Sequence, residues 1–158
     1  PLYIARRIGR FASEDIGMAD SRALEICIAA YDACHYLGYP ECNVHLTHAV
    51  TYCALAPKSN SLYMAYEAAK KDAIATQHLD VPLQIRNAPT RLMKELGYGE
   101  GYEYAHDNKY HVTAMSCMPD ELKNHHYYHP SDQGTEQKVQ IRMKQIEELR
   151  RKIRNEKQ

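Results

Sequence analysis

Apolar residues recur every three or four positions through the first 75 residues, which is the period of an α-helix that buries one face. A first helix is predicted over residues 2–12. It aligns Leu2, Ala5 and Ile8 with Phe11 or Ala12, and its three arginines fall on the other side. Gly17 and Asp20 are expected to end it.

Two further helices are predicted as an antiparallel hairpin. Asp20 or Ser21 caps the first and Gly38 stops it, and Pro40 begins the second after a very short link. The apolar stripe of the first comprises Leu24, Cys27, Ile28, Tyr31 and Cys34, and runs to Leu37. The expected inward side of the second comprises Val44, Leu46, Val50, Cys53 and Ala54.

A fourth helix is predicted after Pro57, with Ser59 or Asn60 as its cap. Its expected buried side comprises Leu62, Tyr63, Tyr66, Ala69 and Ala73. No run of alternating apolar and polar residues precedes residue 110, so no substantial sheet is expected. The pattern therefore predicts an all-α fold, an antiparallel helical bundle.

The stretch from residue 84 to residue 107 is irregular but dense in special residues. Asn87 or Ala88 is expected to cap a short helix at residues 91–96, and Gly97 to end it. The loop that follows alternates glycine with tyrosine. No strand precedes it and no Gly-Lys-Ser/Thr follows it, so a structured surface loop is favoured over a phosphate-binding one.

The remainder is predicted as a long extended arm, about residues 77–135, with one short turn near residues 119–123. A charged amphipathic helix then covers residues 136–156. Its narrow apolar seam comprises Val139, Met143, Ile146, Leu149 and Ile153. We therefore divide the chain into a helical domain at 1–135, including the arm, and a C-terminal helix at 136–158 packed on it.

Composition narrows the possible functions. The 158 residues carry no net charge, thirteen tyrosines, one phenylalanine and no tryptophan, a set that suits half-buried contacts and interfaces. No apolar run approaches the ~18 residues of a membrane span, so no membrane partner and a cytoplasmic location are expected. Because the chain begins at Pro1 instead of methionine, we expect part of a longer protein. Five cysteines without a CxxC pair favour reduced, packed thiols.

Motifs for catalysis are missing from the chain. GxxxxGK[ST], GxSxG and HExxH do not occur, so we expect neither an enzyme nor a resident cofactor or metal. One alternative stays open, a small helical metal-binding enzyme or sensor. It would use Cys34, His45, His48 and Cys53, with the histidines at 125, 126 and 129 as a weaker cluster.

Five stretches of sequence also resemble a known family. They are RNAPTRLMKELGYGEGYEYAHD at residues 86–107, SEDIGMAD at 13–20, GYPEC at 38–42, APKSN at 56–60, and MPDEL at 118–122 followed by Tyr127 and Tyr128. Together they resemble the C-terminal region of the RarA/MgsA family of AAA+ ATPases, which includes the eukaryotic Werner-helicase-interacting ATPase. The resemblance covers about residues 1–135.

The resemblance implies a non-catalytic oligomerisation module, shaped like the helical collar of clamp loaders. Members of the family act in DNA replication, recombination and repair at stalled forks, and assemble as homotetramers. It implies ATP and magnesium as cofactors of an ATPase domain that this chain lacks. The implied partners are further copies of the chain, single-stranded or gapped DNA and replication proteins, in a nucleoid-associated setting.

Six residues are the candidates for contact with DNA phosphates and unpaired bases: Lys58, Arg86, Arg91, Lys94, Tyr98 and Tyr102. Lys58 stands at a predicted helix start, and the others flank or belong to the glycine–tyrosine loop. The alternative is structural. Lys58 would cap a neighbouring helix, and the arginines would pair with Glu95, Glu100 or Glu103.

Overall fold

The computed structural model describes residues 1–157, which fall into two compact units. Unit 1 comprises Pro1–Asp72 and Tyr127–Ile141; unit 2 comprises Ala73–His126 and the chain from Arg142 onwards. Residues 1–157 contain helices and turns and no strand, which confirms the predicted all-α class.

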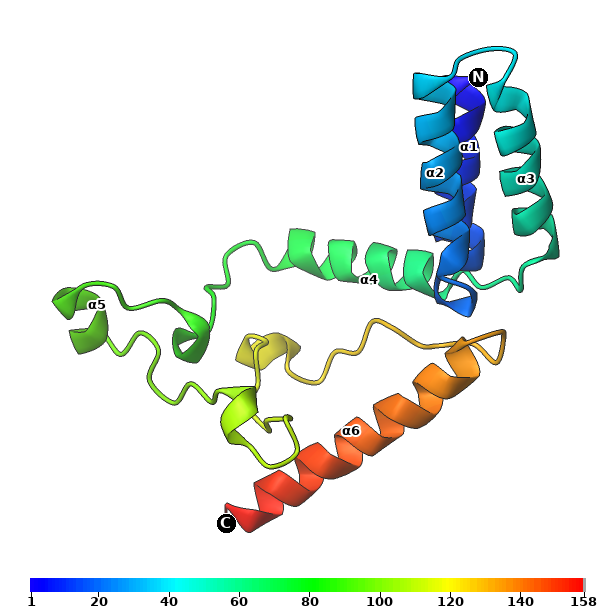
Figure 1. Cartoon of the computed structure of the whole chain (residues 1–158). Coiled ribbons are helices and arrows are strands. Elements are labelled where there is room, and N and C mark those ends of the chain that lie inside the picture. The colour runs from blue at the N-terminus through cyan, green and yellow to red at the C-terminus, as the bar shows by residue number, and fades with distance from the viewer. Residues whose placement is uncertain (158) are drawn as a thin grey trace. The chain divides into compact units, whose positions relative to one another are not determined.

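Three helices form the bundle of unit 1 and lie side by side (Figure 1). They are α1 (Leu2–Phe11), α2 (Arg22–Tyr36) and α3 (Cys42–Leu55), and α1 continues into a π-helical turn at Ala12–Ile16. The Asp20 carboxylate accepts a hydrogen bond from the Arg22 N–H at 3.1 Å, which satisfies a free backbone donor at the start of α2. The short link after α2 makes the antiparallel hairpin, as predicted.

The core of unit 1 is built from small side chains. Its two buried clusters contain six alanines, four cysteines and only two larger aliphatic residues, Ile16 and Leu46. Small side chains let helix axes approach closely, so the facing sides of α1, α2 and α3 are the alanine-rich ones.

The predicted stripes of α2 and α3 were therefore only partly right. Cys27, Cys34, Leu46 and Cys53 are buried as expected. Leu24, Ile28, Val44 and Val50 are instead 43%, 51%, 75% and 49% exposed, Leu37 is 53% exposed, and Ala54 is exposed as well. The prediction chose the largest apolar residues, whereas the packing uses neighbouring positions such as Ala23, Ala30 and Ala49.

The fourth helix, α4 (Ser61–Ala75), differs more strongly from the prediction. It begins where expected, but it contains no buried residue. The predicted buried side was therefore wrong, and Leu62, Tyr63 and Tyr66 are 38%, 37% and 58% exposed. The residues of α4 in unit 1 run away from α1, α2 and α3 instead of alongside them (Figure 1), so none of these three helices packs along its apolar side.

Unit 2 is mostly irregular chain with short helical turns. Its named elements are α5 (Arg91–Glu95) and 3-10 turns at Leu83–Ile85, Ala105–Asp107 and Asp120–Leu122. The hydroxyl of Thr90 caps α5 by accepting from the Met93 N–H, so Asn87 and Ala88 were wrong as caps. Gly97 ends the helix with φ +78°, as predicted.

The last helix, α6 (Glu136–Glu156), begins and ends at the predicted residues and supplies residues to both units. Of its predicted seam, Ile153 is 3% exposed, Met143 is 40% exposed and the others are half-buried. The part of α6 from Arg142 belongs to unit 2, where Arg150 donates a hydrogen bond to the Met115 carbonyl oxygen at 3.1 Å.

Glu136, the first residue of α6, is a fully buried carboxylate at 0% exposure. Its Oε2 accepts from the Ser59 hydroxyl at 2.7 Å, and from the N–H and hydroxyl of Ser131 at 2.8 and 2.5 Å. Its Oε1 accepts from the hydroxyls of Ser61 and Tyr128. The carboxylate thereby joins the start of α4 to the segment that leads into α6.

These donors decide the charge of Glu136. Burial by itself would raise the pKa of this carboxyl group, but hydrogen bonds from Ser131, Ser59, Ser61 and Tyr128 outweigh it and lower the pKa from 4.5 to about 2. Conversely, burial and the hydrogen bond to Glu136 raise the pKa of Tyr128 to about 12. Glu136 is therefore held ionised.

Gly134 lets the segment that leads into α6 pack against the backbone of Ala19. It has φ +52°, and a β-carbon at this position would lie 2.1 Å from the carbonyl oxygen of Ala19. The N–H of Thr135 donates to that oxygen at 2.8 Å, and its hydroxyl donates to the Met18 carbonyl. Only glycine leaves room for this approach.

The first prediction concerns Gly134→Ala. Because the added methyl group forces the backbone apart, we expect the free energy of unfolding to fall by about 2–4 kcal/mol. Gly38→Ala is the matched control, since Gly38 also has positive φ, at +75°, but nothing lies within 4 Å of an added β-carbon. Urea unfolding followed by circular dichroism measures both. Equal losses in the two variants would refute the steric role of Gly134.

The second prediction concerns Glu136→Gln, which keeps the size of the side chain and removes its charge. We expect the free energy of unfolding to fall by about 1–3 kcal/mol at pH 7, because four hydroxyls lose a charged acceptor. The pKa of Glu136 is lower in the folded state, so its stabilisation is complete above about pH 4.5 and is lost as the pH falls towards 2.

The parent protein should therefore lose more stability between pH 7 and pH 3 than Glu136→Gln does. Thermal unfolding at both pH values gives this difference. Glu148→Gln, at an exposed position of α6, is the control and should behave as the parent protein does. A parallel decline of Glu136→Gln and the parent protein would contradict the assignment.

Candidate functional site

The first candidate surface is the α4 face, which we define as Leu62, Tyr63 and Tyr66. These side chains are between 37% and 58% exposed. All three line a groove of about 540 Å³ together with Arg10, Ser13, Glu14, Glu67 and Lys70. Large apolar and aromatic side chains gathered at one exposed place are typical of an interaction site.

The rim of the α4 face carries charges of both signs. Arg10 donates to Glu14 at 2.5 Å, and this hydrogen bond raises the pKa of the Arg10 guanidinium. Lys70 lies 3.9 Å from Glu67 and 5.7 Å from the centre of the Tyr66 ring. A surface with two cations and two anions around an apolar centre can face a second copy of itself without net repulsion.

A second apolar groove lies between α1 and α3. It has a volume of about 380 Å³ and is lined by Arg7, Ile8, Phe11, Val50, Cys53 and Ala54. It shares no lining residue with the α4 groove. Unit 1 thus offers two separate apolar surfaces.

Neither surface was predicted as exposed, because its apolar residues were assigned to the core. The signal that could have found them was the surplus of tyrosine over phenylalanine, together with Arg10 and Glu14 spaced as an i, i+4 ion pair. Both features are typical of a helix side that meets water or another protein.

Two of the predicted DNA-binding residues, Arg86 and Tyr98, lie together in unit 2. The Arg86 guanidinium stands 5.2 Å from the centre of the Tyr98 ring and donates to its hydroxyl at 3.4 Å. That hydrogen bond and the Asp80 carboxylate, 3.4 Å away, raise the pKa of Arg86. The pair presents a stacked cation and aromatic ring, although Asp80 offsets part of the charge.

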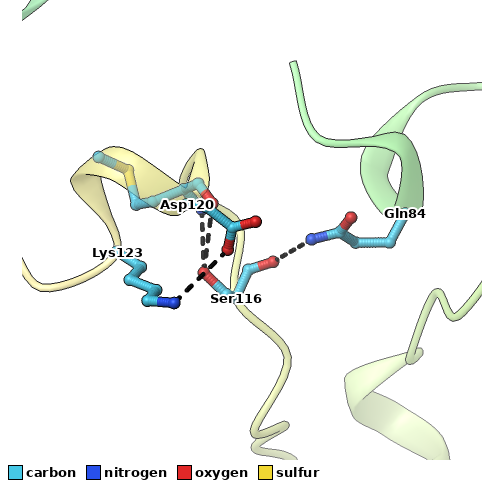
Figure 2. A network of polar contacts seen from close by, with 5 residues as sticks. Gln84, Ser116, Asp120 and Lys123 are labelled. Atoms are coloured by element: carbon cyan, nitrogen blue, oxygen red, sulfur yellow. Dashed lines mark hydrogen bonds and ion pairs between the residues drawn. The ribbon is translucent and has the colours of Figure 1, made fainter. Parts of the chain in front are cut away.

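A polar network holds the chain beside this pair (Figure 2). The Gln84 side chain donates to the carbonyl oxygen of Ser116 at 2.8 Å. The Ser116 hydroxyl donates to the carbonyl oxygen of Met118 and accepts from the N–H of Met118. Lys123 lies 3.8 Å from Asp120 in the adjoining turn. The contacts fix residues 84–86 against residues 116–123 and border a cavity of about 440 Å³ that Arg86 and Asp80 help to line.

The other four candidates are arranged differently. Arg91 donates to Glu95 at 2.8 Å on α5, Lys94 is exposed on the same helix, and Tyr102 is 57% exposed. Lys58 belongs to unit 1, where its ammonium group donates to the carbonyls of Ala54 and Ala56 at the end of α3. Lys58 thus caps the end of α3 and Arg91 pairs with Glu95, which are the contacts that the structural alternative predicted.

Lys58 also borders a cavity of about 690 Å³ at the start of α4. The cavity is lined in addition by Ser59, Asn60, Ser61, Tyr127 and His129, among others. The hydroxyls of Ser59 and Ser61 already donate to the Glu136 carboxylate. These two hydroxyls are therefore already committed to an anion of the chain itself.

The alternative metal site is not formed. Cys34 and Cys53 are buried in different clusters, whereas His45 and His48 are exposed on α3. The Cys53 sulfur lies 3.5 Å from that of Cys27, and burial raises the pKa of the Cys27 thiol to about 12. Residues 1–157 contain no group of three or more Cys, His, Asp or Glu side chains placed to hold a metal ion. Over the same residues, no helix is both long and apolar enough to cross a membrane.

Comparison of the sequence with known proteins identifies the family of the chain. Residues 1–147 match the family described as "MgsA AAA+ ATPase C terminal". The chain is 45% identical over 150 residues to Replication-associated recombination protein A of Coxiella burnetii, covering 94% of this chain and 34% of that protein. The protein of the same name in Escherichia coli K12 is 46% identical over 140 residues, covering 88% and 31%.

A eukaryotic protein is similar as well. The ATPase WRNIP1 of Dictyostelium discoideum is 43% identical over 130 residues, which cover 81% of this chain and 15% of that protein. The chain spans about a third of the length of the bacterial relatives it matches. The matched region is the C-terminal one, and the chain belongs to the MgsA family of AAA+ ATPases.

Proposed function

We propose that this chain is the non-catalytic assembly module of a AAA+ ATPase that acts in DNA replication, recombination and repair at stalled forks. The observation that carries the proposal is the α4 face, an apolar and aromatic surface on a helix without a buried residue. ATP and magnesium are proposed as cofactors of the rest of the protein. The proposed setting is the cytoplasm, beside the nucleoid and other replication proteins.

The proposed assembly is a homotetramer. A tetramer with three perpendicular two-fold axes needs two kinds of self-complementary interface in each subunit. Unit 1 has two separate apolar surfaces, the α4 face and the groove between α1 and α3. The balanced charges around the α4 face suit contact with a second copy.

DNA contact is a second proposed role, through Lys58, Arg86, Arg91, Lys94, Tyr98 and Tyr102. The stacked Arg86 and Tyr98 side chains support it, because such pairs suit phosphates and unpaired bases. The ligand would be single-stranded or gapped DNA.

The third prediction tests assembly with Tyr63→Glu. A carboxylate buried at the interface without a partner should weaken self-association by at least about ten-fold. The solution mass measured by light scattering should therefore fall from about four times the chain mass of 18.2 kDa towards the mass of one chain. Val44→Glu, at a 75% exposed position of α3, is the control and should stay tetrameric. A parent chain of single mass, or a Tyr63→Glu tetramer, would refute the proposal.

The fourth prediction tests the proposed DNA contact with Lys58→Ala and Arg91→Ala. If these cations touch phosphates, each change removes one phosphate contact with a single-stranded oligonucleotide. The slope of the logarithm of the binding constant against the logarithm of the salt concentration should then become shallower by about one. Fluorescence anisotropy at several salt concentrations measures the slope. Lys71→Ala, an exposed lysine of α4 outside the set, is the control. Unchanged slopes would assign Lys58 and Arg91 to the structural contacts they make within the chain.

A further inference from the structure

The cysteines of unit 1 are arranged in facing pairs. Cys27 and Cys34 lie on α2, Cys42 and Cys53 lie on α3, and all four are buried with free thiols. Cys27 shares one core cluster with Cys53, and Cys34 shares the other with Cys42. The contact between α2 and α3 therefore contains a pair of thiols in each cluster. The remaining cysteine, Cys117, is exposed in unit 2.

The sulfurs of Cys27 and Cys53 lie close to bonding distance. They are 3.5 Å apart, and either thiol can donate a hydrogen bond to the other. Because a disulfide joins its sulfurs at about 2.05 Å, these two would have to approach by about 1.5 Å. Ala23, Ala30 and Ala49 pack in the same cluster, so the backbones of α2 and α3 can lie close together around the pair. A small movement therefore separates the two thiols from a disulfide.

One sulfur of the pair can be reached from outside the bundle. Cys53 helps to line the groove of about 380 Å³ between α1 and α3, beside Phe11 and Val50. Cys27 does not line this groove and is 1% exposed. A small oxidant such as hydrogen peroxide fits a groove of this size. Oxidation should therefore begin at Cys53, with Cys27 as the second thiol to react.

We propose that Cys27 and Cys53 form a redox modification site, which a hydroperoxide converts into a disulfide between α2 and α3. The Cys53 thiolate first attacks the O–O bond of hydrogen peroxide, which breaks to leave a sulfenic acid on Cys53 and a hydroxide ion. The Cys27 thiolate then attacks that sulfur, forms the S–S bond and displaces a second hydroxide ion. The two hydroxide ions take up the two thiol protons. The pair thus loses two electrons and two protons, and the peroxide is reduced to two molecules of water.

Burial makes this reaction slow. The thiolate is the reactive form of cysteine, and burial, with a smaller contribution from the hydrogen bond to Cys53, raises the pKa of the Cys27 thiol to about 12. The Cys27 thiol is therefore protonated at neutral pH while the bundle is closed. The site suits a response to sustained exposure to peroxide, and the exposed thiol of Cys117 should react first.

The disulfide has a measurable consequence for stability. It would join residues 26 positions apart in the sequence and so restrict the unfolded chain more than the folded one. We expect the melting temperature of unit 1 to rise by about 5–10 °C on oxidation. The proposal requires neither self-association nor contact with DNA, and it concerns only the thiols between α2 and α3.

The test uses Cys117→Ser, which removes the exposed thiol and leaves the pair intact. This chain is incubated with hydrogen peroxide, unfolded, alkylated with iodoacetamide and digested without a reductant. Mass spectrometry should find one peptide joined to another through Cys27 and Cys53, lighter by two hydrogens than the two reduced peptides together. Dithiothreitol should restore both thiols and the lower melting temperature, because it returns two electrons and two protons to the disulfide.

Two substitutions provide the matched comparison. Cys53→Ala should abolish the linked peptides and the rise in melting temperature. Cys34→Ala, which removes the same group from the other cluster, should retain both. The linked peptides are also sought in the chain with an intact pair, so an unstable variant does not decide the outcome.

Two results would overturn the proposal. One is full alkylation of Cys27 and Cys53 after an exposure to peroxide that has completely oxidised Cys117 in the parent chain. The other is a disulfide that joins Cys53 to a different cysteine or to a second chain. Isotope-labelled and unlabelled chains mixed before oxidation distinguish a link within one chain from a link between two.

Discussion

The buried Glu136 carboxylate is the constraint on which the order of unit 1 depends most. A charged group at 0% exposure is tolerated only when its lone pairs are filled, and here they accept from three serines and one tyrosine. The donors come from the start of α4 and from the segment before α6, so one side chain joins parts of the chain that are up to 77 residues apart. Gly134 and Thr135 then bring the same segment against Ala19.

The small core residues have a second consequence. With alanine and cysteine filling the space between α1, α2 and α3, the larger apolar side chains of these helices are left outside. The α4 face adds two exposed tyrosines to them. A monomer would keep this surface in water, whereas association would remove it at a gain of roughly 25 cal/mol for each Å² of apolar area. The small residues of the core and the large apolar residues of the proposed assembly surfaces therefore have one cause, the placement of alanine and cysteine on the facing sides of α1, α2 and α3.

The sequence predicted helices more reliably than the faces they bury. The bounds of α6, the α2–α3 hairpin and the left-handed Gly97 all agree with the structure. The faces did not follow, because a surface suited to a partner is as apolar as a core, and periodicity cannot tell them apart. The Thr90 cap was missed in favour of neighbouring positions with similar propensity.

The candidate site was predictable only in part for the same reason. Arg86 and Tyr98 lie in one recognisable stretch, and they meet in space. The contacts of Glu136 connect distant stretches, and no local pattern marks which glutamate the serines will face.

Net charge conceals a division between the two units. Unit 1 has eight basic and ten acidic side chains and carries the two apolar surfaces, whereas unit 2 has twelve basic and ten acidic ones and carries the Arg86–Tyr98 pair. If unit 2 makes the proposed DNA contact, one copy of this nearly balanced unit would hold a strand only modestly. The proposed assembly would change this, because linked copies act at a high effective concentration along the same strand, and avidity rises without any new contact. On this argument the proposed assembly through unit 1 would set how strongly unit 2 holds a nucleic acid.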